Sequence, residues 1–178
     1  IAEKEGTKRG PYGGALGIFA PDDVEAVITI RSVVLRGDRA FVQAGKLLDA
    51  MLASIGLARG EDVYIANAVK CRPPGNRTPE ASEIAACHPF LERQIALIQP
   101  RLIIALGRPA AQTLLNAEIK IGTARGRLFD RQGIPVIVTY HPAYLLRNLE
   151  DKAKSWEDLC FAQDQMRRLK ASPRGDGA

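Results

Sequence analysis

Short apolar stretches alternate along the chain with longer segments of helical periodicity. Four of the apolar stretches are rich in β-branched residues and are bounded by turn residues, which is typical of buried strands. They span residues 25–34, 62–69, 101–106 and 134–139. Because these stretches are continuously apolar, they predict an α/β fold with helices on both faces of a parallel sheet.

Helices are expected wherever apolar residues recur three and four positions apart. The expected helices span residues 44–55, 78–86, 89–99, 109–116 and 152–170. Pro89 separates the second helix from the third, because proline has no N–H to donate inside a helix. Residues 117–133 are interpreted as a loop with four basic side chains. These are Lys120, Arg125, Arg127 and Arg131.

The predicted elements fall within one domain over residues 25–170. Residues 1–24 are rich in glycine and charge and show no apolar period, so we expect this segment to be poorly ordered. The same expectation holds for the tail, residues 171–178. The chain begins with Ile1 and not with methionine, which is compatible with a fragment of a longer protein.

Composition and charge leave several functions open and disfavour others. The net charge of +5 permits nucleic acid as a partner without requiring it. No apolar stretch approaches the roughly 20 residues that cross a bilayer, so we expect no membrane association. The three cysteines do not make an even set of disulfides, which favours a reducing, cytoplasmic location. A monomer is the default expectation.

Three residues with chemical potential lie at or just after the ends of predicted strands. They are Asn67, Gly107 and His141. The carboxyl ends of parallel strands meet at one edge of a sheet, and ligands bind beyond that edge. An asparagine there can pair with the edge of a nucleobase or simply cap a turn. A histidine there can donate a hydrogen bond to a ligand or serve the structure alone.

The stretch KCRPPGNR, residues 70–77, places basic side chains around two prolines. Prolines stiffen such a loop, which suits contact with phosphates, although a solvated turn has the same composition. Cys71 and Cys87 can supply half of a four-ligand metal or iron–sulfur site, or they are ordinary free cysteines. Cys160 lies on a predicted helix and is interpreted as a core residue.

Five stretches, in order, carry a resemblance to a known family. They are KLLDAML, VYIANAVKCRPPGNRTP, CHPFLERQI, ALGRPAAQTLL and TYHPAYLLR. Together they resemble the family 4 uracil-DNA glycosylases, which carry an iron–sulfur cluster, over residues 41 to 160. The resemblance implies a three-layer fold with a central parallel sheet of about four strands between helices. It also implies hydrolysis of the N-glycosidic bond of flipped-out uracil in DNA, at the start of base excision repair in a prokaryotic-type cytoplasm.

The resemblance assigns three residues to the base. Asn67 matches the asparagine that binds the Watson–Crick edge of uracil. Phe41, in AFVQAG, matches the aromatic residue that stacks on the base. His141 matches the histidine of the His-Pro motif, which stabilises negative charge on uracil O2 as the glycosidic bond breaks.

The resemblance also implies residues that contact DNA. The loop after His141 would insert Leu145 and Leu146 into the duplex, with Arg147 near a phosphate. The basic loop would add further phosphate contacts through Arg72 and Arg77. The partner implied is uracil-containing DNA.

The N-terminal part departs from the family pattern. Cys71 and Cys87 match the second pair of cluster ligands, but the family's earlier Cys-x-x-Cys pair is absent, so a [4Fe–4S] cluster lacks two of its four ligands. The family's Gly-Glu-Ala-Pro-Gly motif, whose glutamate positions water, is replaced by VITIRSVVLRGD. We expect impaired activity, and a damaged, altered or truncated N-terminal region would explain the departure.

Two alternatives to the glycosylase remain open. The first is a non-catalytic DNA-binding domain of the same fold, which would bind DNA in a salt-dependent way without releasing a product. The second is an unrelated enzyme in which Cys71 or Cys87 acts as a nucleophile near His88.

Overall fold

The computed structural model describes residues 26–30, 38–71, 73–74, 77 and 79–171. Of residues 26–30 and 38–44, only the backbone is described. The predictions of disorder for residues 1–24 and 172–178 therefore lie outside the described residues, whereas Ala171, the first residue of the predicted tail, is helical. Among the helices that are described, none is long and apolar enough to cross a membrane.

A mixed sheet with the strand order β2-β1-β3-β5-β4 forms the middle of the fold. Four strands are parallel: β1 (Ala26–Ile30), β2 (Val63–Asn67), β3 (Leu102–Leu106) and β5 (Ile134–Thr139). Each of them lies in one of the four predicted apolar stretches. The fifth strand, β4 (Leu128–Arg131), runs antiparallel to β5 at the edge of the sheet. The predicted α/β class is confirmed, with a mixed sheet flanked by helices.

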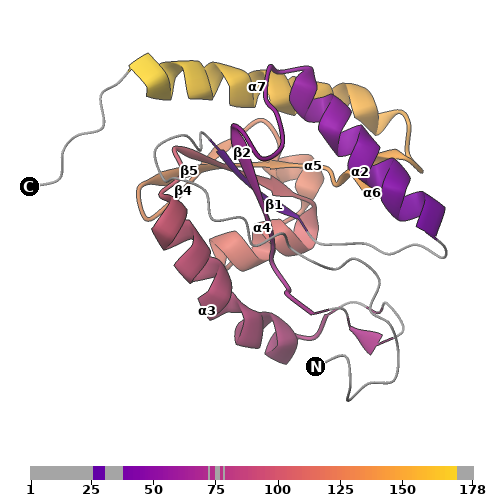
Figure 1. Ribbon diagram of the computed structural model, residues 1–178, viewed down its shortest axis with the longest axis vertical. Coiled ribbons are helices and arrows are strands. Elements are labelled where there is room, and N and C mark those ends of the chain that lie inside the picture. The colour runs from indigo at the N-terminus through magenta and orange to yellow at the C-terminus, as the bar shows by residue number, and fades with distance from the viewer. Residues whose placement is uncertain (1–25, 31–37, 72, 75–76, 78, 172–178) are drawn as a thin grey trace, which may run out of the picture.

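Helices cover both faces of this sheet (Figure 1). One face packs against α2 (Asp38–Ala53) and α7 (Asp151–Ala171), and the other packs against α3 (Ala81–Ile98) and α4 (Arg108–Leu115). Two single-turn helices, α5 (Ile121–Ala124) and α6 (Pro142–Leu145), complete the fold. Side chains along β3 alternate between the two faces and all are buried, which explains why the stretch is continuously apolar.

The predicted break at Pro89 is wrong. Helix α3 runs without interruption through Pro89 and begins at Ala81, where Glu80 and Glu83 form a capping box. The proline ring is exposed, and its missing N–H removes one hydrogen bond from the helix. Leu91 and Ile95, in the next two turns, are buried against the sheet, and their burial offsets that loss.

The prediction of a loop over residues 117–133 is also wrong in part, because this stretch contains α5 and β4. Gln132 and Gly133 both have positive φ and form the turn from β4 into β5. Arg131 is buried, and its Nε donates to the carbonyl oxygen of Leu114 at 3.0 Å. Arg131 therefore ties the hairpin to α4.

Candidate functional site

Asn67 and His141 lie at the same edge of the sheet. Asn67 ends β2, and His141 follows the last residue of β5 by two positions. The strands between them, β1 and β3, run parallel to β2 and β5. The carboxyl ends of all four strands therefore lie at this edge. We call this edge the rim. The rim is the location at which ligands bind in open parallel sheets.

The hydrogen bonding of His141 favours one protonation state of its ring. His141 is the N-cap of α6, and its Nδ1 accepts a hydrogen bond from the backbone N–H of Ala143 at 3.1 Å. A ring nitrogen accepts only when it carries no proton, so this bond favours the neutral imidazole with its proton on Nε2. Nε2 is buried in the protein. The cap bond therefore fixes the orientation of the ring and the direction in which Nε2 points.

Gly107 brings the end of β3 against His141. It follows β3 with φ of 86°, and its N–H donates to the carbonyl oxygen of Thr139 at 2.8 Å. A Cβ atom built on Gly107 would lie only 3.1 Å from the Cβ of His141. Both the backbone conformation and the close approach require glycine at this position.

Substituting alanine for Gly107 is expected to displace His141 and to lower the free energy of unfolding by about 1–3 kcal/mol, because positive φ strains any residue with a Cβ. Gly133→Ala is the matched control, since Gly133 has nearly the same φ but open space around its Cβ position. Denaturant unfolding measures the free energy of unfolding of both variants. Equal effects of the two substitutions on the His141 ring, observed by NMR, would contradict the proposed close packing.

Lys70 holds the end of β2 in place. Its Nζ donates to the carbonyl oxygen of Asn67 at 2.7 Å and to Oε1 of Gln94 on α3. Burial lowers the pKa of Lys70, and the nearby Cys87 acts in the opposite direction. The sequence suggested only that this lysine belongs to a basic loop suited to phosphates. The structure shows it fixing the backbone of Asn67.

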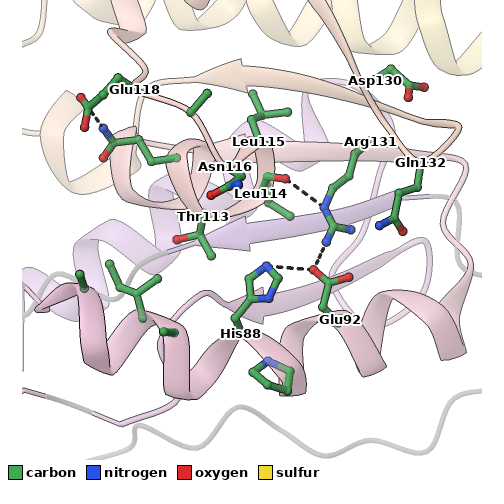
Figure 2. Close-up of a pocket in the computed structure, with 16 residues that line it drawn as sticks. His88, Glu92, Thr113, Leu114, Leu115, Asn116, Glu118, Asp130, Arg131 and Gln132 are labelled. Atoms are coloured by element: carbon green, nitrogen blue, oxygen red, sulfur yellow. Dashed lines mark hydrogen bonds and ion pairs between the residues drawn. The ribbon is translucent and has the colours of Figure 1, made fainter.

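A cavity of about 890 Å³ lies away from the rim, between α3, the end of α4 and the β4–β5 turn (Figure 2). Its lining includes His88, Glu92 and Arg131, with His88 Nε2 3.0 Å from Glu92 Oε1 and Arg131 also bonded to Glu92. The turn precedes the first residue of β5, so the cavity is at the opposite end of that strand from His141. Among the described residues, none that the glycosylase resemblance assigns to the site lines this cavity, whereas His88, named in the thiol-nucleophile alternative, does.

The family model for the Uracil DNA glycosylase superfamily matches residues 29–160, which include the rim residues. The chain belongs to this superfamily. It is 44% identical over 133 residues to the type-4 uracil-DNA glycosylase of Pyrobaculum aerophilum, an alignment that covers 69% of this chain and 67% of the relative. The type-4 enzyme of Archaeoglobus fulgidus is 46% identical over 120 residues, which are 63% of this chain and 60% of the relative.

The type-4 uracil-DNA glycosylase of Thermotoga maritima is 47% identical over 119 residues, 65% of this chain and 62% of the relative. The chain thus spans about three fifths to two thirds of the lengths of these glycosylases.

A second family model, for chorismate-binding enzymes, matches residues 1–46. Over 46 residues the chain is 48% identical to anthranilate synthase component 1 of Acetivibrio thermocellus, which is 25% of this chain and 9% of that relative. This match covers the N-terminal part that departs from the glycosylase pattern and overlaps the glycosylase match over residues 29–46. Phe41 lies inside both matched ranges.

The cysteines do not fit the cluster that the glycosylase family implies. The N–H of Lys70 donates to Sγ of Cys87 at 3.3 Å, so Cys87 lies beside the loop that carries Cys71. Cys160 lies on α7, on the other face of the sheet from α3. The sequence has no further cysteine, and among the described residues no group of three or more His, Cys, Asp or Glu could hold a metal. Two thiols cannot replace the four thiolates of a [4Fe–4S] cluster.

The hydrogen bonds of Cys87 and His88 disfavour the thiol-nucleophile alternative. Sγ of Cys87 accepts from the backbone of Lys70, and Nε2 of His88 pairs with Glu92. An activated thiol requires contact with a base, whereas these two groups bind other partners.

The loop after His141 differs in detail from the prediction. Leu145 is 1% exposed and packs in the core beside α2 and α7, so it cannot insert into DNA without unfolding α6. Leu146 is half-buried and Arg147 is exposed. Leu149, which the sequence reading missed, is 63% exposed. Its proximity to the His-Pro motif was visible in the sequence, but its exposure was not.

The two arginines predicted in the basic loop have different outcomes. Arg72 lies outside the described residues. Arg77 is exposed and forms a bidentate ion pair with Glu83, with N···O distances of 2.8 and 2.9 Å. To bind a phosphate, Arg77 has to exchange this carboxylate for the new anion.

Proposed function

We propose that this chain is a uracil-DNA glycosylase with reduced turnover that acts on uracil-containing DNA. The observation that carries the proposal is the rim itself. In a chain of the glycosylase superfamily, an asparagine and a helix-capping histidine occupy the same sheet edge, and Gly107 packs directly against the histidine. This activity makes it an intracellular DNA-repair protein.

Asn67 supplies the recognition of the base. Its amide has a donor and an acceptor side by side, which complement O4 and N3–H of uracil. Cytosine presents the reverse pattern at these positions, so a fixed amide would face a donor with a donor. The bonds of Lys70 to the Asn67 carbonyl and to α3 support a fixed backbone at this point.

His141 supplies the stabilisation of the leaving base. As the glycosidic bond breaks, negative charge develops on uracil O2, and the Nε2–H of His141 donates to that oxygen. A neutral donor whose geometry is set before the reaction lowers the barrier by about 3–4 kcal/mol. The bond from Ala143 to Nδ1 provides that preorganisation.

The reaction is slow because the glutamate of the family's Gly-Glu-Ala-Pro-Gly motif is missing from this sequence. The residues after β1 read RSVVLRG in place of the family motif with its glutamate. Without a group to orient and deprotonate the attacking water, turnover falls by roughly 100-fold or more. Phe41 is proposed as the stacking partner of the base, although it lies in the segment shared with the second family match.

DNA contacts are proposed for the surface around α6. Arg147 contacts phosphate, together with Arg72 and Arg77 from the basic loop. Leu149, with Leu146 beside it, provides the apolar wedge in place of the buried Leu145.

Replacing Leu149 with alanine is expected to reduce uracil release from duplex DNA by about 10-fold, because the wedge offsets a few kcal/mol of unstacking. Release from single-stranded DNA, which has no stack to break, should change little. Leu97→Ala is the control, since Leu97 is similarly exposed but lies on α3. Equal losses on both substrates would contradict the wedge.

A uracil-release assay tests the proposed function. A uracil-containing oligonucleotide should yield free uracil and an abasic site, and an oligonucleotide with cytosine at the same position should not. The missing carboxylate motif favours a second candidate, a DNA-binding domain without catalysis. That candidate predicts salt-dependent DNA affinity with no uracil released at any enzyme concentration.

A further inference from the structure

The strand that leads to His141 is anchored to α7 by a buried hydroxyl. Thr139 is the last residue of β5 and is fully buried. Its Oγ1 donates to Oδ2 of Asp158 at 2.6 Å and lies 3.1 Å from Oγ of Ser155. Both partners are buried residues of α7, and Asp158 is 2% exposed.

An ion pair between Arg125 and Asp158 connects these contacts to Tyr140, the residue after Thr139. Nε of Arg125 donates to the same oxygen of Asp158 at 2.9 Å, and the Arg125 guanidinium lies 5.7 Å from the ring centre of Tyr140. Burial raises the pKa of Asp158, while the hydrogen bonds from Thr139 and Arg125 oppose that rise. The two residues that precede His141 are thus both in contact with one partly buried ion pair, in which the carboxylate of Asp158 is fully buried.

The chain after His141 is held by the same helix. Tyr144 stacks on Tyr140 with ring centres 5.1 Å apart, and its hydroxyl donates to Asp151 of α7 at 2.7 Å. The N–H of Tyr144 donates to the carbonyl oxygen of His141 at 2.9 Å. Helix α7 therefore fixes the backbone on both sides of the histidine.

A buried ion pair contributes little net stability, because removing two charges from water costs about as much as their attraction returns. Its orientation of neighbouring groups is the more specific effect. We propose that the Asp158–Arg125 pair is a positioning device for His141, acting through Thr139 and Tyr140. This inference rests on the proposed function, since it assigns the pair to the donor that faces uracil O2.

The experiment observes the ring of His141 directly. The chain has two histidines, and in protein labelled with ¹⁵N-histidine the second, His88, is an internal reference. Thr139→Val removes the hydroxyl but keeps the shape, and Asp158→Asn removes the charge. In the wild type, His141 should show the neutral ring with its proton on Nε2. In both variants this signal should shift or broaden, and that of His88 should not.

The matched control is Thr113→Val, since Thr113 is also buried but donates to Pro109 within α4. It should leave the His141 ring and the rate unchanged, and Thr139→Ser should retain the wild-type signal. In the uracil assay, Thr139→Val should lower kcat about 10- to 100-fold with little change in KM, as expected for a misplaced catalytic group. An unchanged His141 signal in folded Thr139→Val and Asp158→Asn proteins would overturn the inference. Absence of uracil release by the wild type would instead refute the proposed function and leave the NMR comparison valid.

Discussion

Exchanging His141 for alanine is expected to slow uracil release about 100- to 1,000-fold, the usual cost of losing one preorganised donor to a developing oxyanion. The loss should appear in kcat, because the donor interacts most strongly with the charge that forms as the bond breaks. Steady-state release of uracil from a labelled oligonucleotide measures it. Removing the ring deletes an N-cap bond as well, so the stability of each variant has to be measured in parallel.

His88→Ala is the control for this experiment. His88 is the other histidine of the chain, and it lies on α3 beside the cavity at the far end of β5. Its loss removes a surface pair with Glu92, which contributes little to stability. Similar rates for His88→Ala and His141→Ala would show that the rim histidine has no special part in the reaction.

Replacing residues 1–46 with a segment that carries the family's Gly-Glu-Ala-Pro-Gly motif and Cys-x-x-Cys pair is expected to raise uracil release by about 100-fold or more, because it returns a carboxylate that positions water. The exchange also returns the family's Cys-x-x-Cys pair, which together with Cys71 and Cys87 completes a four-thiolate set. The purified hybrid should therefore absorb visible light and contain about four iron atoms per chain.

Two comparisons make this exchange informative. The original chain should be colourless with little iron, since it offers two thiols at this position. The hybrid with Cys71→Ser should lose iron while keeping the carboxylate, which separates the effect of the cluster from that of catalysis. Iron and turnover in the original chain equal to those of the hybrid would contradict the view that the N-terminal part lacks a cluster-binding pair and a catalytic carboxylate.

The central strands and the rim were predictable from the sequence because they obey simple rules. A strand buried on both faces has to be apolar at every position, as β3 is with all five residues buried. Parallel strands bring their carboxyl ends together, so Asn67 and His141 could be assigned to one edge before any coordinates. The order of motifs then supplied the family, which the comparisons confirm.

The features that the sequence did not reveal depend on packing. Strand β4 is short, lies at the edge and is largely exposed, so it carries no apolar signal. Pro89 is tolerated because the turns after it are anchored in the core, which outweighs one lost hydrogen bond. In α6, a single helical turn, the sequence cannot indicate that Leu145 faces inward while Leu149 remains exposed.

The position of β1 has a consequence for how the molecule holds together. Residues 26–30 lie within the stretch that matches chorismate-binding enzymes, yet they pair in register with β2 on one side and β3 on the other. Removing residues 1–30, and β1 with them, would part β2 from β3 and leave the facing backbone groups of both strands open to intermolecular pairing. Such a shortened protein would self-associate instead of forming a smaller enzyme, so β1, in which the ranges of the two family matches begin to overlap, is structurally indispensable to the sheet.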